Sequence, residues 1–323
     1  MDNRISSKKI VCVGGGVGTS NLLRGLKNFA TNLTIITSMA DDGGSSGRLR
    51  KEYDIMPPGD IIYCIASLIP DSKKELSELL LYRFPGENEA NTAIDGHKLG
   101  NLIMLAEIQR TGDFYKAIDA VKRIFSIKAE LLPATDEHVQ LSAITHDGRT
   151  IHSETTLDLA LYSAPHGLKN IFITPTHPVV NKRVIDSLIQ ADVIISGPGD
   201  LYTNQLPVLI VPEIAEAFRL SKADKIFILN TANKPFETNN FTLPDYLRAF
   251  QDHLGHNPFT KVYANNNFSI PIPSKYQYDY INLDHMRLNR EFKIELIEAD
   301  LVNNDFPLYH DSKKLADALL KTL

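Results

Sequence analysis

Short apolar runs alternate with helically spaced apolar residues over most of the chain. Residues 10–13 are wholly apolar, residues 22–29 carry apolar side chains at helical spacing, and residues 34–37 form the next short run. Wholly apolar short runs are typical of strands buried on both faces, whereas intervals of three and four mark one face of a helix. These residues therefore predict a βαβ unit whose strands are parallel and whose crossover is right-handed.

The same alternation continues toward the C-terminus. Asp113 precedes helically spaced apolar residues at 114–125 and is expected to cap that helix, and further helices are expected at 184–191 and 214–220. Four later runs are predicted strands: 170–173, 193–195, 226–229 and 262–264. Strands that alternate with helices in this way predict one α/β domain over residues 1–323, with a Rossmann-like, doubly wound and mainly parallel sheet.

One region interrupts the alternation. Residues 131–156 contain short polar–apolar strands, and His146-Asp147-Gly148 carries the Asp-Gly pair of tight hairpin turns. We therefore expect a β-hairpin insertion at the edge of the core rather than a separate domain.

The composition argues against several classes of protein. The 323 residues carry a formal net charge of −5, which disfavours the basic surface of a nucleic-acid-binding protein. No apolar run approaches the roughly 20 residues that cross a bilayer, and the N-terminal stretch lacks the pattern of a signal peptide. Cys12 and Cys64 lie in apolar runs, so we expect buried thiols in a cytoplasmic protein without a membrane partner.

A glycine-rich loop directly follows the first predicted strand. It contains Gly14, Gly15, Gly16 and Gly18 and leads into Thr19 and the first predicted helix. Glycines let a ligand approach the backbone, and a helix N-terminus offers free amides and the positive end of the helix dipole. We expect this loop to bind a phosphate, with a tight turn that binds nothing as the alternative. The third glycine lies one position early for a dinucleotide fingerprint, which disfavours an NAD-dependent enzyme.

A second polar cluster follows the second predicted strand. Asp41 and Asp42 could accept hydrogen bonds from ribose hydroxyls, or together bind Mg²⁺, because adjacent carboxylates repel a phosphate unless a cation bridges them. The next residues could add donors and a cation for a diphosphate: Gly43, Gly44, Ser45, Ser46 and Arg48. A solvated glycine-serine loop is the alternative.

Later segments of the chain are expected to form the wall of the site that faces these two loops. His97 and Asn101 precede an expected helix at 102–108, and from the pattern alone binding and scaffold roles are equally supported. Further candidates follow two predicted strands: Gly197, Gly199, Asp200, Tyr202, Asn230 and Lys234. Ligands of doubly wound sheets bind beyond the carboxyl ends of the strands, so we expect these residues to face one crevice. In contrast, residues 57–60 (Pro-Pro-Gly-Asp) are interpreted as a turn and a helix N-cap.

No motif assigns a catalytic residue. No zinc-ligand spacing occurs in the sequence.

The order of these motifs resembles the YvcK-like family of gluconeogenesis factors, within a superfamily that includes CofD-like 2-phospholactate transferases. The Asp-Asp-Gly-Gly-Ser-Ser-Gly-Arg string at 41–48 is its most specific part. The other segments that carry the resemblance cover most of the chain: 14–20, 57–61, 96–102, 132–136, 197–203 and 230–238.

The resemblance implies a cytoplasmic bacterial protein that binds a nucleotide sugar, UDP-N-acetylglucosamine in particular, and that is linked to carbon metabolism, cell shape and wall synthesis. It also implies an alternative, a Mg²⁺-dependent transferase acting on a nucleoside-diphosphate-linked or phosphorylated substrate. The chain departs from the family pattern at Ile62-Tyr63, usually Arg-Asn, at Lys98, usually Ser, and at Tyr309, usually Arg. Arginine clamps a phosphate bidentately and lysine does not, so these departures change how a diphosphate would be held.

The leading hypothesis is a nucleotide-sugar-binding regulator that forms a homo-oligomer. In this hypothesis Gly15, Gly16 and Thr19 cradle the diphosphate, and Asp41 and Asp42 face the ribose or a possible Mg²⁺ ion. The opposite wall is formed by His97 and Asn101 together with Gly199, Asp200 and Tyr202. Whether a reaction is catalysed is left open by the residues themselves.

Overall fold

The centre of the molecule is a seven-stranded sheet. The computed structural model of the chain describes residues 7–86, 93–159, 161–162 and 167–323. The strand order is β12-β10-β8-β7-β1-β2-β3, and every neighbouring pair is parallel. The strands are β1 (Ile10–Val13), β2 (Leu33–Thr37), β3 (Glu130–Pro133), β7 (Val193–Ser196), β8 (Asp224–Ile228), β10 (Lys261–Asn265) and β12 (Glu295–Ala299). The chain starts at the middle of the sheet and extends it first to one side and then to the other, which confirms the doubly wound α/β fold.

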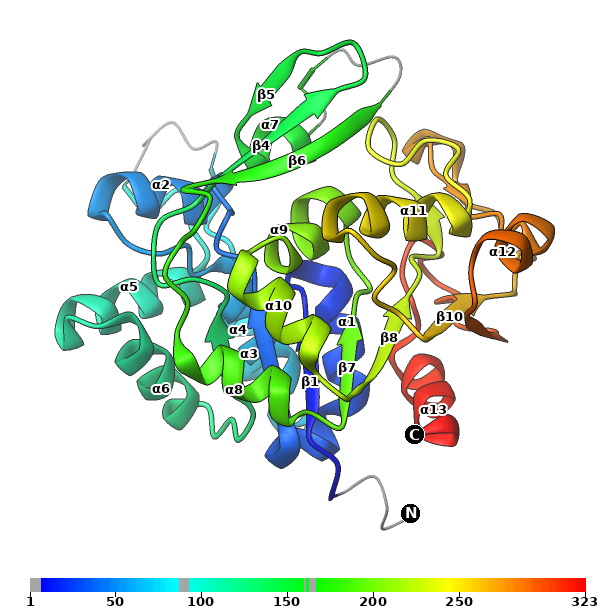
Figure 1. Cartoon of the computed structure of the whole chain (residues 1–323). Coiled ribbons are helices and arrows are strands. Elements are labelled where there is room, and N and C mark those ends of the chain that lie inside the picture. The colour runs from blue at the N-terminus through cyan, green and yellow to red at the C-terminus, as the bar shows by residue number, and fades with distance from the viewer. Residues whose placement is uncertain (1–6, 87–92, 160, 163–166) are drawn as a thin grey trace.

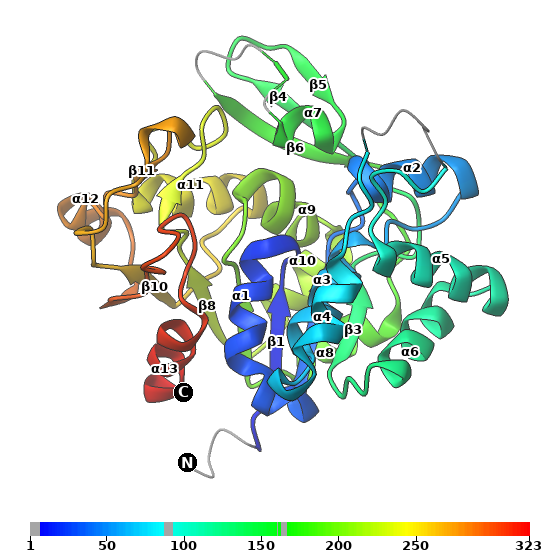
Figure 2. The same ribbon diagram turned by 180° about the vertical axis from the view of Figure 1, so that it is seen from behind.

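Helices cover both faces of this sheet. Figure 1 shows α8 (Lys182–Gln190), α9 (Leu206–Leu209) and α10 (Pro212–Leu220) in front of it. Figure 2 shows α1 (Gly16–Leu26), α3 (Gly59–Leu68) and α13 (Ser312–Thr322) on the opposite face. The remaining long helices are α2 (Gly44–Tyr53), α4 (Lys74–Leu81), α5 (Leu99–Thr111), α6 (Phe114–Ile124), α11 (Leu243–Leu254) and α12 (His285–Glu291). Because both faces are covered, all four residues of β1 and of β7 are buried, as the apolar runs at 10–13 and 193–195 predict.

A separate three-stranded antiparallel sheet lies beyond the carboxyl ends of the parallel strands (Figures 1 and 2). It consists of β4 (Gln140–Thr145), β5 (Thr150–His152) and β6 (Leu168–Thr174), with α7 (Glu154–Asp158) between the last two. The hairpin of β4 and β5 turns at the predicted Asp-Gly pair, where Gly148 has a φ of 83°.

The structure corrects the expected extent of this insertion. Residues 131–133 do not belong to it, because they form β3 at the edge of the parallel sheet. Residues 170–173 do belong to it, because β6 pairs antiparallel with β4 instead of joining the parallel sheet. The burial of β6 alternates along the strand, as expected for a strand with one face in solvent.

Other predicted elements form near their expected positions. Asp113 caps α6 by accepting a hydrogen bond from the Lys116 amide, and the helices expected at 184–191, 214–220 and 102–108 are α8, α10 and part of α5. The pattern missed β12 and the small sheet of β9 (Ala232–Asn233) and β11 (Asp279–Tyr280). Short helical turns complete the chain at 27–32, 71–73, 201–205 and 274–276.

Cys12 and Cys64 are both buried free thiols, as predicted. Among the described residues, the helices are too short or too polar to cross a bilayer.

Candidate functional site

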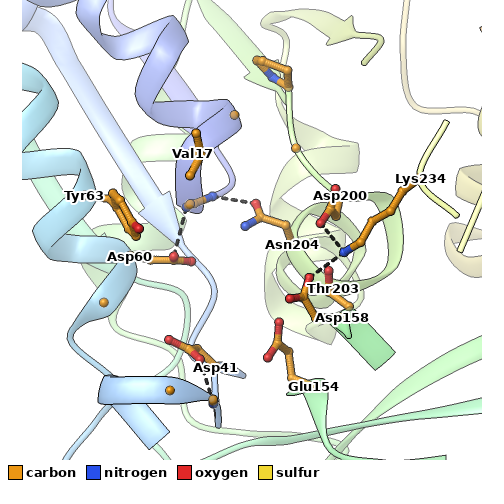
Figure 3. A pocket seen from close by; sticks show the side chains of 18 of the residues that line it. Val17, Asp41, Asp60, Tyr63, Glu154, Asp158, Asp200, Thr203, Asn204 and Lys234 are labelled. Atoms are coloured by element: carbon orange, nitrogen blue, oxygen red, sulfur yellow. Dashed lines mark hydrogen bonds and ion pairs between the residues drawn. The ribbon is translucent and has the colours of Figure 1, made fainter. Parts of the chain in front are cut away.

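A cavity of about 690 Å³ opens at the carboxyl ends of the parallel strands. Its lining comes largely from the loops and helix N-termini that follow β1, β2, β7 and β8, with α7 of the three-stranded sheet opposite (Figure 3). The direction in which strands are added to the sheet reverses at β1. The chain continues from β1 to β2 on one side of it and later adds β7 on the other side. Ligands of doubly wound sheets bind at this position, and the volume lies in the range of small-molecule sites.

Most of the residues predicted from the sequence meet at this cavity. Those that line it are Gly15, Gly16, Gly18, Asp41, Gly43, Gly44, Ser45, Ser46, Asn101, Gly199, Asp200, Asn230 and Lys234. The predicted residues outside its lining are Gly14, Thr19, Asp42, Arg48, His97, Gly197 and Tyr202. Segments far apart in the sequence therefore line one cavity, as the position of most of these motifs after a strand suggested.

The glycine loop after β1 is filled by the chain itself. The Gly15 amide donates to Asn204 Oδ1 at 2.6 Å, and the Gly16 amide donates to Asp60 Oδ1 at 2.9 Å (Figure 3). A Cβ atom at Gly15 would lie 2.0 Å from Asp60 Oδ2, so this glycine is required by the carboxylate of α3. The amides of Gly15 and Gly16, both expected to cradle a phosphate, thus already have partners, and a phosphate bound to them would displace Asn204 and Asp60.

Thr19 does not reach the cavity either. Its buried hydroxyl donates to the carbonyl of Pro198 at 3.4 Å, and a Cβ atom at Gly18 would lie 2.6 Å from the same oxygen. The Gly-Pro-Gly loop therefore packs tightly on the start of α1. Gly14 and Gly197 contribute to this packing, since their amides donate to the carbonyls of β2 and β1.

The N-terminus of α2 has a different environment. The amides of Gly44, Ser45 and Ser46 have no hydrogen-bond acceptor within the described part of the chain, whereas the Gly43 amide donates to Asp41 Oδ1 at 3.0 Å. All of these residues line the cavity. The start of α2 therefore presents three free amides to the cavity.

Ser45 joins the start of α2 to the start of α5. Its hydroxyl accepts from the Lys98 amide at 3.3 Å and from Asn101 Nδ2 at 3.0 Å, and it contacts His97 Nδ1 at 3.0 Å. Because the hydroxyl accepts the first two bonds, it donates its proton to His97 Nδ1. His97 thus supports the site from outside the cavity, while Asn101 lines it and leaves its buried Oδ1 without a partner.

Lys98 lies on the ring of Tyr63. The side chain is 8% exposed, and its ammonium lies 3.6 Å from the ring centroid. No carboxylate of the described chain lies within 4.0 Å of this ammonium, and both residues line the cavity. Burial and the nearby Arg83 guanidinium lower the pKa of Lys98 to about 8. Two departures from the family pattern are therefore in contact with each other.

Lys234 has a contrasting environment on the other wall. Its ammonium lies 2.5 Å from Asp158 and 2.7 Å from Asp200 (Figure 3). It also lies 3.3 Å from Glu237. Burial opposes its charge, but the three carboxylates raise its pKa above the usual value. Because Asp158 belongs to α7, this cluster attaches the three-stranded sheet to the core.

Asp42 does not face the cavity with Asp41. Its carboxylate instead accepts hydrogen bonds from the hydroxyls of Ser153 and Thr155 and from the amides of Glu154 and Thr155. Asp42 therefore holds the N-terminal end of α7, and the expected pair of cavity carboxylates is reduced to Asp41. Arg48 is also turned aside, since its guanidinium donates to the carbonyl of Asp95 at 2.6 Å.

The cavity carboxyls hold protons more strongly than usual. Burial and the Asp41 charge raise the pKa of Glu154 to about 10 and that of Asp60 to about 7. Burial also raises the pKa of Asp41, against hydrogen bonds from the Gly43 amide and the Ser46 hydroxyl. The site is thus less negative near neutral pH than its five acidic lining residues suggest.

The sequence pattern did not identify four of the lining residues as part of the site: Asp60, Glu154, Asp158 and Asn204. The Pro-Pro-Gly-Asp motif was visible, but Asp60 lies in the first turn of α3 and accepts from the neighbouring helix, while Pro58 takes the N-cap position. Glu154 and Asp158 lie in the insertion, and only its placement over the strand ends brings them to the cavity.

The donor set allows a limited role for a metal. Among the described residues, no group of three or more His, Cys, Asp or Glu side chains could hold a metal ion. Mg²⁺ commonly binds one or two carboxylates together with substrate phosphates. Asp41 could supply such a carboxylate, whereas Asp42 is committed to α7.

Comparisons with known proteins agree with this fold. The model of a family described as 2-phospho-L-lactate transferase CofD matches residues 10–321. The gluconeogenesis factor of Bacillus subtilis is 36% identical over 322 residues, which cover 98% of each chain. The crystal structure of a UPF0052 family protein from Bacillus halodurans superimposes with a TM-score of 0.87 at 33% identity and covers 97% of this chain and 98% of that one.

Proposed function

The chain belongs to the CofD family and is a relative of the gluconeogenesis factors, and from that premise we propose that it binds a nucleotide sugar in the cavity at the strand ends. The observation that carries this proposal is the convergence of four helix N-termini on one cavity. Residues in the first turns of α1, α2 and α3, and at the start of α5, all line it. Helix N-termini favour anions because their amides and dipoles present positive charge, and a diphosphate is such an anion.

The remainder of the lining suits the other parts of a nucleotide sugar. Tyr278, Leu308 and Tyr309 give an aromatic and apolar region, while Asn230 and Thr231 offer amide and hydroxyl groups. A UDP-N-acetylglucosamine-like ligand, which the family resemblance implies, has the same combination of an aromatic base, hydroxyls and a diphosphate. A cytoplasmic regulator of carbon metabolism and cell shape is part of the same proposal.

Calorimetry tests the proposal directly. We expect UDP-N-acetylglucosamine to bind the folded protein with saturable heat, and UDP to retain part of that affinity because it carries the same diphosphate. N-acetylglucosamine alone is expected to give no heat. The absence of heat with either nucleotide at millimolar concentration would falsify the proposal.

A transferase is the second candidate, because the matched family model is described as 2-phospho-L-lactate transferase and Asp41 places a carboxylate in the cavity. Mg²⁺ would then be held by Asp41 together with the phosphates of the substrate, and it would offset the negative charge of those phosphates. The test measures product formation from nucleoside-diphosphate donors and the Mg²⁺ dependence of nucleotide affinity. If no product forms and the nucleotide affinity does not depend on Mg²⁺, the nucleotide-sugar-binding protein is the better account.

A further inference from the structure

The start of α1 and the start of α2 both meet the cavity, but they differ in what their amides already bind. The amides of Gly15 and Gly16 donate to Asn204 and Asp60, so the first two amides at the start of α1 are taken by groups of the chain, whereas those of Val17 and Gly18 have no acceptor among the described residues. Of these, Asp60 is a carboxyl group, so it takes the place that an anion would take at a helix N-terminus. A phosphate at this helix would therefore compete with Asn204 and Asp60 for the first two amides.

The start of α2 offers the opposite condition. Gly44, Ser45 and Ser46 present amides that lack acceptors in the described chain, and a Cβ atom at Gly44 would meet nothing within 4 Å. The helix has ten residues, long enough for its dipole to add to the attraction of these amides for an anion.

Lys98 supplies an independent observation beside this helix. Its buried ammonium has no carboxylate or hydrogen-bond acceptor among the described residues and lies only against the Tyr63 ring. A buried charge is costly unless it is paired, and a ring face compensates only part of that cost. The backbone of Lys98 is hydrogen-bonded to Ser45, which ties this cation to the start of α2.

We propose that the phosphate groups of the ligand bind at the N-terminus of α2, on the amides of Gly44, Ser45 and Ser46, with Lys98 as their counter-charge, and not at the glycine loop after β1. This inference rests on the proposed function, because it presumes a phosphorylated ligand in the same cavity. It adds the location of the phosphates and assigns Lys98, held in place by Tyr63, as a residue that determines affinity for them.

The charged groups around Lys98 are compatible with this role. Arg83 adds a second cation to the same lining, while Asp41 and Asp60 add carboxyls whose affinity for protons is raised by burial. A phosphate that binds here would be expected to take up a proton or a divalent cation with it, so the affinity is measured at fixed pH with and without Mg²⁺.

The test compares two pairs of variants by calorimetry with UDP and with UDP-N-acetylglucosamine. Gly44→Ala places a methyl group in the proposed phosphate site, and Gly112→Ala is its control, because both glycines have positive φ and open space around the Cβ position, but Gly112 lies at the far end of α5. Lys98→Met removes the cation, and Lys225→Met, its control, removes a half-buried lysine that lies beside an aromatic ring outside the cavity.

We expect Gly44→Ala and Lys98→Met each to lower the affinity for both nucleotides at least tenfold, and each control to stay within twofold of the wild type. Tyr63→Leu is expected to lower it about threefold, since Lys98 loses its support. Wild-type affinity in both Gly44→Ala and Lys98→Met would overturn the location of the phosphates while leaving the proposed function intact. A wild-type protein that binds neither nucleotide would overturn both.

Thermal unfolding of each variant accompanies these titrations. Gly44→Ala and Lys98→Met probe the same site through unrelated changes, so if one of them does not fold, the other still decides the question.

Discussion

Two lysines face the same cavity from opposite walls, and their surroundings differ in almost every respect. Lys234 lies within 3.3 Å of three carboxylates, and these raise its pKa above the usual value. Lys98 has no carboxylate within 4.0 Å in the described chain, and burial lowers its pKa to about 8. One ammonium is thus committed to the structure of the protein, and the other is left with an aromatic ring.

The difference shows that a cation in a binding site is not automatically a ligand for an anion. Lys234 was predicted from the sequence as a site residue, and it does line the cavity, but its charge is neutralised by Asp158, Asp200 and Glu237. Lys98 was noted as a departure from a family pattern, and it is the lysine whose charge is available. The first two of the three predictions below test this division between a structural and a ligand-binding cation, and the third tests the carboxyl at the start of α1.

The largest effect is expected from Lys234→Met. Removing the ammonium leaves three carboxylates without their shared cation, and breaking a buried ion pair by loss of one partner costs several kcal/mol. We expect a loss of about 3 kcal/mol in the free energy of unfolding, measured by urea denaturation.

The matched control for that prediction is Lys98→Met. No carboxylate loses a partner in this variant, and methionine keeps most of the apolar packing of the lysine stem, so we expect a change within about 1 kcal/mol. Equal losses in the two variants would show that the lysines do not differ in the way described.

A somewhat smaller effect is expected from Ser45→Ala, at the junction of α2 and α5. The change leaves the Lys98 amide and His97 Nδ1 without the hydroxyl and weakens the contacts of Asn101, and unpaired buried polar groups are costly. We expect a loss of about 2 kcal/mol in urea denaturation, and lower affinity for UDP because Lys98 loses its position.

Ser187→Ala is the comparison for this variant. The Ser187 hydroxyl makes one bond within α8, to the carbonyl of Val184, so its removal is expected to cost less than about 1 kcal/mol. If Ser45→Ala were no more destabilising than Ser187→Ala, the hydroxyl would not be the junction that the contacts suggest.

Asp60→Asn tests the carboxyl that occupies the start of α1. Burial raises the pKa of Asp60 to about 7, so the folded protein favours its neutral form. The wild type therefore loses stability as the pH rises from the unfolded value of about 4 to about 7, whereas the asparagine variant does not. From pH 5 to pH 8, we expect the free energy of unfolding of the variant to rise relative to that of the wild type by on the order of 2 kcal/mol.

A variant outside the cavity that changes no ionisable group provides the reference for this measurement. Gly112→Ala is expected to show the same difference in stability from wild type at both pH values. A relative stability of Asp60→Asn that stayed constant, or fell with rising pH, would contradict a buried carboxyl at this position.

The sequence alone predicted the strands that are completely buried. The apolar runs of β1 and β7 are wholly buried, so their pattern predicted them directly. It was insufficient for β6, because a short apolar run does not reveal which sheet a strand joins.

The same limit applies to the site. Glycines at 15 and 18 signalled a ligand loop, yet the close approach of Asp60 and Pro198 accounts for them. Lys98 and Tyr63 are 35 positions apart, and only the fold brings them into contact. What the sequence located correctly was the edge of the sheet, because the motifs at 14–20, 41–48, 197–203 and 230–234 each follow a strand.

The most direct test of the central claim is a crystal structure of the protein with UDP bound. We predict that phosphate oxygens lie about 3 Å from the amides of Gly44, Ser45 and Ser46 and from Lys98 Nζ. In that structure Asn204 and Asp60 would still accept the amides of Gly15 and Gly16. Phosphates bound to Gly15 and Gly16, with Asn204 and Asp60 displaced, would contradict the claim.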